Sequence, residues 1–106
     1  MSKVRVLQLS RCSQCHALIT KLDAVRVSYD LVDADENATL ADTIEQLLNA
    51  VNYPIVTIEQ PPITTHLYRA TDSVDMGLHF IDHHTNKIGC VTVDGMLDQI
   101  INLLKK

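Results

Sequence analysis

The sequence has no tryptophan, one phenylalanine, three glycines and three cysteines, and it contains no long apolar segment. A transmembrane helix needs about 20 consecutive apolar residues, so none is expected, and no apolar secretory leader is recognisable. Three cysteines are an odd number, and two of them are three positions apart, which does not fit the disulfide framework of a small secreted protein. We therefore expect a cytoplasmic protein that has no membrane partner.

Positive charge is also scarce. Nine lysines and arginines stand against thirteen acidic residues, which gives a formal net charge of −4. The basic residues are scattered and do not follow one helix, so a surface that tracks a phosphate backbone is not expected, nor is nucleic acid as a partner. With 106 residues and 46% hydrophobic composition, the chain is long enough for one core and too short for two. We expect a single domain over residues 1–106.

The feature around which the chain is organised is a C-x-x-C motif, Cys12 and Cys15, within residues 11–16. The motif follows a strand-like apolar run at residues 4–9 and precedes a helical pattern. At a strand-to-helix junction, the unpaired N–H groups and the dipole of the helix favour the thiolate form of Cys12. Cys15 follows one helical turn later on the same side, so the two sulfurs can form and reopen a disulfide. The apolar residues expected on the buried face of this helix are Leu18, Ile19, Leu22 and Val25.

The rest of the chain has further strand and helix patterns. The residue before a proline avoids the helical conformation, so Tyr53-Pro54 is expected to end a second helix and to lead into a buried strand. Residues 60–77 are predicted to form a loop or an extra hairpin. The other expected elements are a strand at 26–32, a helix from Thr39 to Val51, strands at 55–58, 78–82 and 87–91, and a last helix from Val93.

The order β-α-β-α-β-β-α, with C-x-x-C after the first strand and X-Pro before the third, resembles the thioredoxin fold, and the length is similar to that of a glutaredoxin. The resemblance covers the chain except roughly residues 60–77. It implies an α/β fold in which a central mixed β-sheet is flanked by three helices. In that family, the cysteine corresponding to Cys12 is the nucleophile of thiol–disulfide exchange, and the one corresponding to Cys15 resolves the mixed disulfide.

The same resemblance implies a substrate site beside the cysteines. The peptide corresponding to Tyr53-Pro54 is cis in that fold and leaves the preceding backbone free to pair with a substrate. Ile88-Gly89-Cys90 lies where glutaredoxins carry Gly-Gly, next to the site for the γ-glutamyl end of glutathione. The residues expected to contact substrate are Arg11, Gln14, Tyr53, Pro54, Gly89 and Cys90.

The pair between the cysteines, Ser13-Gln14, differs from the common glutaredoxin motif. A C-x-Q-C motif is similar to that of glutaredoxin-like redoxins, which take electrons from thioredoxin reductase and pass them to ribonucleotide reductase. We expect a dithiol–disulfide oxidoreductase with no tightly bound cofactor. Its substrate is expected to be a disulfide-containing protein, and glutathione and thioredoxin reductase both stay open as electron source.

Two other functions stay open at this point. Cys12, Cys15, His16 and Cys90 offer soft ligands for Zn²⁺, or Cys12 holds one corner of an iron–sulfur cluster. Alternatively, the chain is a binding module whose cysteines are incidental.

Two interpretations stay open for the role of several individual side chains. Arg11 and His16 either assist the thiolate or point to solvent, and Cys90 is either a buried strand residue or a third redox group. The three histidines at positions 79, 83 and 84 are read as solvated residues around a turn.

Overall fold

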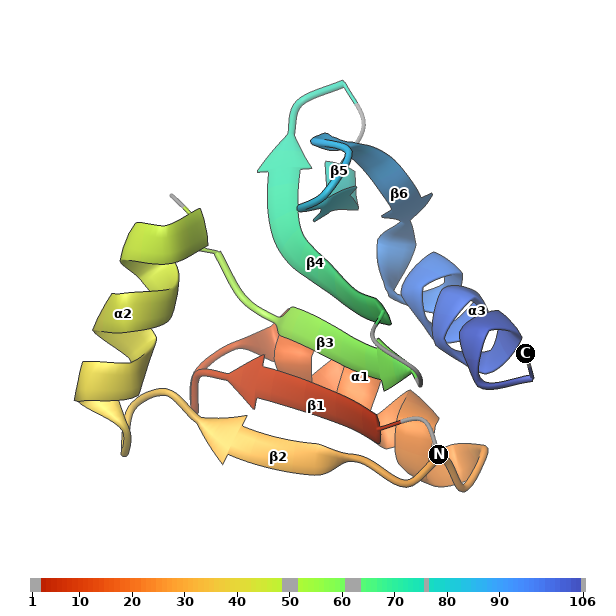
Figure 1. The fold of residues 1–106 in the computed structure, drawn as a ribbon, viewed down its shortest axis with the longest axis horizontal. Helices are drawn as coiled ribbons and strands as arrows, with labels where there is room; N and C mark the ends of the chain where they lie inside the picture. The colour runs from red at the N-terminus through yellow and green to blue at the C-terminus, as the bar shows by residue number, and fades with distance from the viewer. Residues whose placement is uncertain (1–2, 49–51, 61–63, 76, 106) are drawn as a thin grey trace.

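A six-stranded mixed sheet forms the centre of the computed structural model, which describes residues 3–48, 52–60, 64–75 and 77–105 (Figure 1). The strands lie in the order β2-β1-β3-β4-β5-β6, with β1 and β2 parallel and every other neighbouring pair antiparallel. The elements are β1 (Lys3–Gln8), α1 (Ser13–Ala24), β2 (Asp30–Asp33), α2 (Ala38–Leu48), β3 (Ile55–Gln60), β4 (Thr64–Ser73), β5 (Gly77–Asp82), β6 (Lys87–Val91) and α3 (Thr92–Leu104).

The alternation of side chains along β1 and β3 divides the apolar residues between the two faces of the sheet. Val6 pairs with Val56 on one face, and Leu7 pairs with Ile55 on the other. Because β1 and β3 are antiparallel, the last residues of β1 lie beside the first residues of β3, at one end of the two strands. The C-x-x-C segment follows β1, and the Tyr53-Pro54 peptide precedes β3, so the candidate site lies at this end of the strands.

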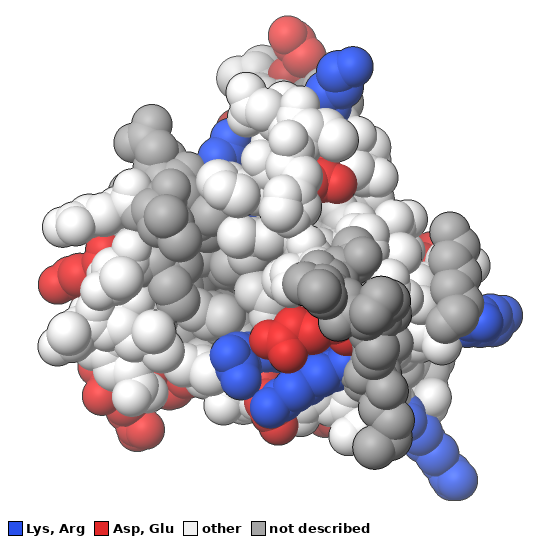
Figure 2. All heavy atoms as spheres, in the orientation of Figure 1, with Lys and Arg blue, Asp and Glu red and all other residues white. Residues whose placement is uncertain are grey.

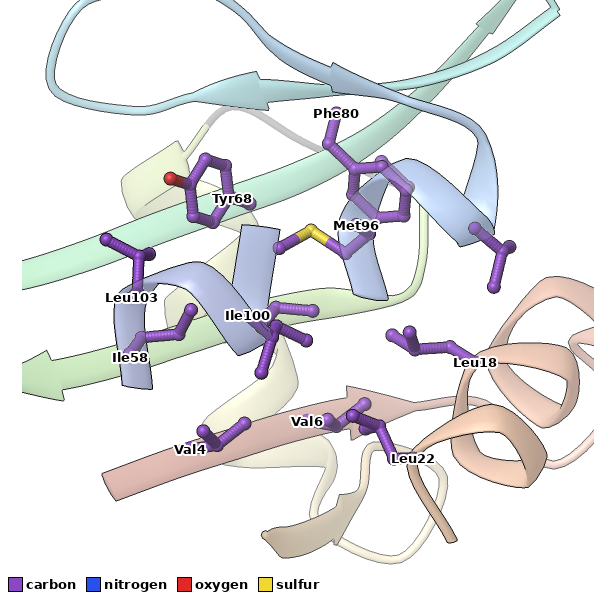
Figure 3. Packing of buried hydrophobic residues seen from close by; sticks show 13 residues of the cluster. Val4, Val6, Leu18, Leu22, Ile58, Tyr68, Phe80, Met96, Ile100 and Leu103 are labelled. Atoms are coloured by element: carbon purple, nitrogen blue, oxygen red, sulfur yellow. The ribbon is translucent and has the colours of Figure 1, made fainter. Parts of the chain in front are cut away.

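Helices α1 and α3 cover the face that contains Val6 and Val56. Figure 3 shows Met96 of α3 between Tyr68 and Phe80, and its helix neighbour Ile100 directed toward the strands. The ion pair between Lys21 and Asp94, at 2.6 Å, links the two helices at the surface. The buried members of this cluster are Val4, Val6, Leu18, Leu22, Val56, Ile58, Tyr68, Ala70, Phe80, Val93, Met96, Ile100 and Leu103.

Helix α2 lies on the opposite face, where its Ala41 packs in a smaller cluster with Leu7 and Ile55. Ile88 and Val91 of β6 are 46% and 41% exposed, so the cover does not extend to the far edge of the sheet. The expected mixed sheet with three flanking helices is therefore present, but the flanking differs in that residues of the outer strand β6 stay partly uncovered. Within the described residues, every helix falls short of the length and apolarity that crossing a bilayer would require.

The segment read as a loop or extra hairpin is part of the main sheet. β4 pairs along β3 from Gln60↔Thr64 to Ile55↔Arg69, and its second half pairs with β5. The observed order is therefore β-α-β-α-β-β-β-β-α, which corrects the expected order. The polar and aromatic residues of β4 alternate too irregularly for the strand to be recognised without its two neighbours.

The second strand begins at Asp30, four residues later than its sequence pattern indicates. The end of α1 explains the delay: Arg26 has a positive φ of 60°, its N–H donates to Asp23 O, and the N–H of Val27 donates to Leu22 O. These two bonds form a Schellman motif, which satisfies the last helical carbonyls before the chain can extend. Val25, expected on the buried face, is the C-cap residue and is 45% exposed.

The helix cap generates a prediction about stability. A non-glycine residue in the left-handed conformation is strained, so Arg26→Gly should raise the free energy of unfolding by roughly 0.5–1 kcal/mol. Arg26→Ala, which keeps the Cβ atom, should give no such gain. Urea unfolding of both variants checks this, and equal stabilities for the two variants would contradict it.

Candidate active site

Cys12 and Cys15 form a disulfide at the N-terminus of α1, with their Cα atoms 5.2 Å apart. Cys12 is the N-cap residue, and its Sγ accepts a hydrogen bond from the backbone N–H of Cys15 at 3.1 Å. Cys15 has no exposed surface, whereas Cys12 is partly exposed. The two sulfurs are therefore unequal, because only Cys12 can be reached by another molecule.

The peptide between Tyr53 and Pro54 is cis, as expected, and it lies against the disulfide. The carbonyl oxygen of Tyr53 is 3.6 Å from Cys12 Sγ. The Tyr53 ring packs with Cys15 and Ala41 in the smaller apolar cluster. Two expected site residues, Tyr53 and Pro54, are thus brought to the exposed sulfur.

A hydrogen bond connects Tyr53 to α2. The Tyr53 hydroxyl donates to Glu45 Oε1 at 3.1 Å. Burial raises the pKa of Tyr53 to about 12, and the bond to Glu45 and the negative charges of Glu45, Asp42 and Asp35 add to the shift. The phenol therefore stays protonated at neutral pH and continues to donate.

Asp35 anchors the loop that leads to Cys12. Its Oδ2 accepts the backbone N–H of Ser10 at 2.8 Å and also the Ser10 hydroxyl. The neighbouring backbone is held as well, since Ala34 N–H donates to Gln8 O at 2.7 Å. The bonds from Ser10, together with the charge of Arg11, lower the pKa of Asp35 below its ordinary value. The turn before α2 thereby positions the segment between β1 and α1.

Sequence reasoning missed Ser10, Asp35 and Glu45. Single carboxylates and a serine outside any motif carry no local signal, and their partners lie 25 and 8 positions away in the chain. Arg11, Gln14 and His16, which the sequence did single out, are exposed around the start of α1. The charge of Arg11 acts on Asp35, and no hydrogen bond from Gln14 or His16 to either sulfur is found in the described part of the chain.

Gly89 and Cys90 lie on β6, at the opposite end of the sheet from β2. Three strand spacings separate β6 from β3, roughly 14 Å along the sheet, so the structure does not bring these two residues together with Cys12. Cys90 packs against the larger cluster, with its Sγ 3.6 Å from Met96 Sδ. Burial raises the pKa of the Cys90 thiol to about 11. These contacts are those of a partly buried strand cysteine.

The proposed metal ligands are not gathered in one place. In the ranges that the structure describes, no group of three or more histidine, cysteine and acidic side chains has the arrangement of a metal site. His79 corrects the expectation of solvated histidines, since it is 7% exposed and its Nδ1 is 2.9 Å from Gly77 O.

Packing explains the glycine at position 89. A Cβ atom there would lie 2.7 Å from Cε1 of Tyr68, a buried ring whose hydroxyl accepts a hydrogen bond from Gln99. Gly89→Ala should therefore lower the free energy of unfolding by about 1–3 kcal/mol. Gly95→Ala is the matched control, because its Cβ would meet Cys90 of β6 and Thr92 only at ordinary contact distances of 3.6 and 3.8 Å, and the substitution should be neutral or stabilising. Equal effects of the two substitutions in urea unfolding would contradict the assignment.

The lowered pKa of Asp35 predicts a pH-dependent contribution to stability. A carboxyl whose pKa is depressed by folding stabilises the protein above its unfolded pKa, and the effect disappears as pH falls through the folded pKa. The wild type should be more stable than Asp35→Asn at pH 7, and the difference should shrink as the pH falls below about 4. Urea unfolding across this range checks the prediction. A difference that does not change with pH would show that the charge of Asp35 is not involved.

Comparison with known proteins agrees with the geometry of the first three strands. A scan against protein-family models matches the family described as Glutaredoxin over residues 3–62. The matched stretch includes both cysteines of the motif and the Tyr53-Pro54 peptide. Searches of curated proteins and of solved structures found no significant match. Because the family model covers more than half of the 106 residues, the chain belongs to the glutaredoxin family.

Proposed function

We propose that the protein is a dithiol–disulfide oxidoreductase that reduces disulfides of other proteins, with Cys12 as nucleophile and Cys15 as resolving cysteine. Members of the glutaredoxin family are generally thiol–disulfide oxidoreductases, which supports this function. The observation that carries the assignment of roles is the unequal exposure of the two sulfurs. Cys12 is accessible at the helix N-terminus, and Cys15 is fully buried behind it.

In the first step, the reduced Cys12 thiolate attacks one sulfur of the substrate disulfide. The substrate S–S bond breaks, a Cys12–substrate disulfide forms, and the departing substrate sulfur takes a proton from water. The N–H of Cys15, which already bonds to Cys12 Sγ at 3.1 Å, stabilises negative charge on that sulfur. The carbonyl of Tyr53, 3.6 Å from Cys12 Sγ, is placed to accept a backbone N–H of the substrate.

In the second step, Cys15 loses its proton and attacks Cys12 Sγ. The mixed disulfide breaks, the second substrate thiol leaves, and two electrons have passed from the protein to the substrate. The product is the Cys12–Cys15 disulfide, the form described above. Because Cys15 is one helical turn from Cys12, this step requires no large movement of α1.

Two further electrons must return the disulfide to the dithiol. Glutaredoxins typically use glutathione for this purpose and protein disulfides as substrates, and the C-x-Q-C motif favours thioredoxin reductase as the donor and ribonucleotide reductase as the substrate. We propose that electrons arrive from one of these two sources, that no cofactor is tightly bound, and that the protein works in the cytoplasm. The free thiol of Cys90 suits a reducing compartment.

Insulin reduction tests the proposal. The purified protein is assayed with NADPH and either glutathione plus glutathione reductase or thioredoxin reductase. Cys12→Ser should reduce the rate to the background of the assay, because it removes the nucleophile. Cys15→Ser should stop turnover on this protein disulfide and accumulate a Cys12–substrate disulfide, which mass spectrometry detects.

Thiol titration and circular dichroism serve as controls that each variant is reduced and folded. Full activity of Cys12→Ser would overturn the assignment of the nucleophile. Inactivity of the wild type with both electron donors, despite titratable thiols, would overturn the oxidoreductase function and favour a metal carrier or a binding module.

A further inference from the structure

The residues between Arg26 and Arg69 include no lysine or arginine. The same stretch carries seven acidic residues, and it forms α2, the turn before it, and the Tyr53-Pro54 peptide. One side of the candidate active site is therefore built from a segment with carboxylates and no permanent cation. The acidic residues of this stretch are Asp30, Asp33, Asp35, Glu36, Asp42, Glu45 and Glu59.

Three of these carboxylates converge on the Tyr53 side of the disulfide. Glu45 accepts the hydroxyl of Tyr53, and Asp35 binds Ser10, two residues before Cys12. Asp42 lies three residues before Glu45 on the same helix, which places the two on neighbouring positions of one face. Their negative charge acts on the Tyr53 hydroxyl, and the carbonyl of the same residue is next to Cys12 Sγ. Negative charge therefore lies on the α2 side of the position where a substrate backbone would pair.

Asp42 and Glu45 form no ion pair with another described residue. The ion pairs Lys3–Asp30 and Lys21–Asp94 lie outside α2. The charge of Arg11 acts on Asp35, and the guanidinium of Arg69 donates to Asn86 at 3.2 Å, in the turn after β5. On the face shown in Figure 2, the part formed by α2 carries red and white surface and no blue.

We infer that the site selects its substrates by charge: Asp42 and Glu45, on the α2 side of Tyr53, favour protein disulfides flanked by lysine or arginine and disfavour anionic disulfides such as those of glutathione. The inference rests on the proposed oxidoreductase function. The carboxylates are not the site itself, which remains Cys12 and the Tyr53 backbone. Glu45 is hydrogen-bonded to the hydroxyl of Tyr53, and the carbonyl of the same residue lies next to Cys12 Sγ, so charge on α2 acts on a partner that approaches the site. Complementary charge around a reactive group raises the association rate by tenfold or more at low ionic strength and loses this effect in salt.

The test uses two matched peptides, each with one cysteine joined by a disulfide to a neutral 2-thiopyridyl group. Two lysines flank the cysteine in one peptide and two glutamates in the other, and the same derivative of glutathione is a third probe. Attack of Cys12 on the peptide sulfur releases pyridine-2-thione, and stopped-flow absorbance follows its release from the prereduced protein. The lysine peptide should react about tenfold faster than the other two probes at low ionic strength, and this ratio should approach one in about 0.5 M NaCl.

Asp42→Asn should reduce the preference for the lysine peptide by about threefold, because it removes one charge beside Tyr53. Glu59→Gln is the matched control: it removes one charge from the opposite end of β3, where Glu59 pairs with Lys3 of β1, and should leave the preference unchanged. Equal rates for the three probes, or equal effects of the two substitutions, would overturn the charge selection while leaving the redox function intact. Wild-type rates no higher than those of Cys12→Ser with every probe would instead overturn the redox function.

Discussion

Leu7 of β1 pairs with Ile55 of β3, and the remainder of the candidate site depends on this antiparallel register. The register brings the loop after β1 and the peptide before β3 to the same end of these two strands, so that Tyr53 O lies close to Cys12 Sγ. It also sorts the apolar side chains, because a slip of one residue would exchange the two faces of each strand. The packing of the core and the assembly of the site are therefore consequences of the same pairing.

The smaller apolar cluster connects the sheet to the chemistry. Cys15 and Tyr53 are members of it, so the Cys15 sulfur is held by packing and, of the two sulfurs, only that of Cys12 meets solvent. Two carboxylates on the α2 side complete the arrangement by bonding to Ser10 and to the Tyr53 hydroxyl. The groups that position the loop and the Tyr53-Pro54 peptide are thus the same groups that make this side of the site negative. Asp35 and Glu45 thus combine a positioning hydrogen bond with a negative charge, whereas Asp42 contributes charge alone.

The long hairpin of β4 and β5 is the main difference between this structure and the fold that the family resemblance predicts. It inserts two strands between β3 and β6, and α3 still covers the face because Met96 and Ile100 pack on the widened sheet. Gly89 consequently has a packing role under the Tyr68 ring, away from the disulfide.

Local signals in spacing or in a breaker residue were enough to predict the strand–C-x-x-C–helix unit, the second helix, the break at Pro54 and the last helix. The family resemblance also predicted that both cysteines and Tyr53-Pro54 belong to one site. The place of residues 64–73 depends on the fold, since a strand with irregular alternation is defined by its neighbours. The fold likewise sets which sulfur is exposed, places Cys90 on a distant strand, and brings Ser10, Asp35 and Glu45 to the site. These properties depend on contacts between residues far apart in the chain, and no local pattern encodes such contacts.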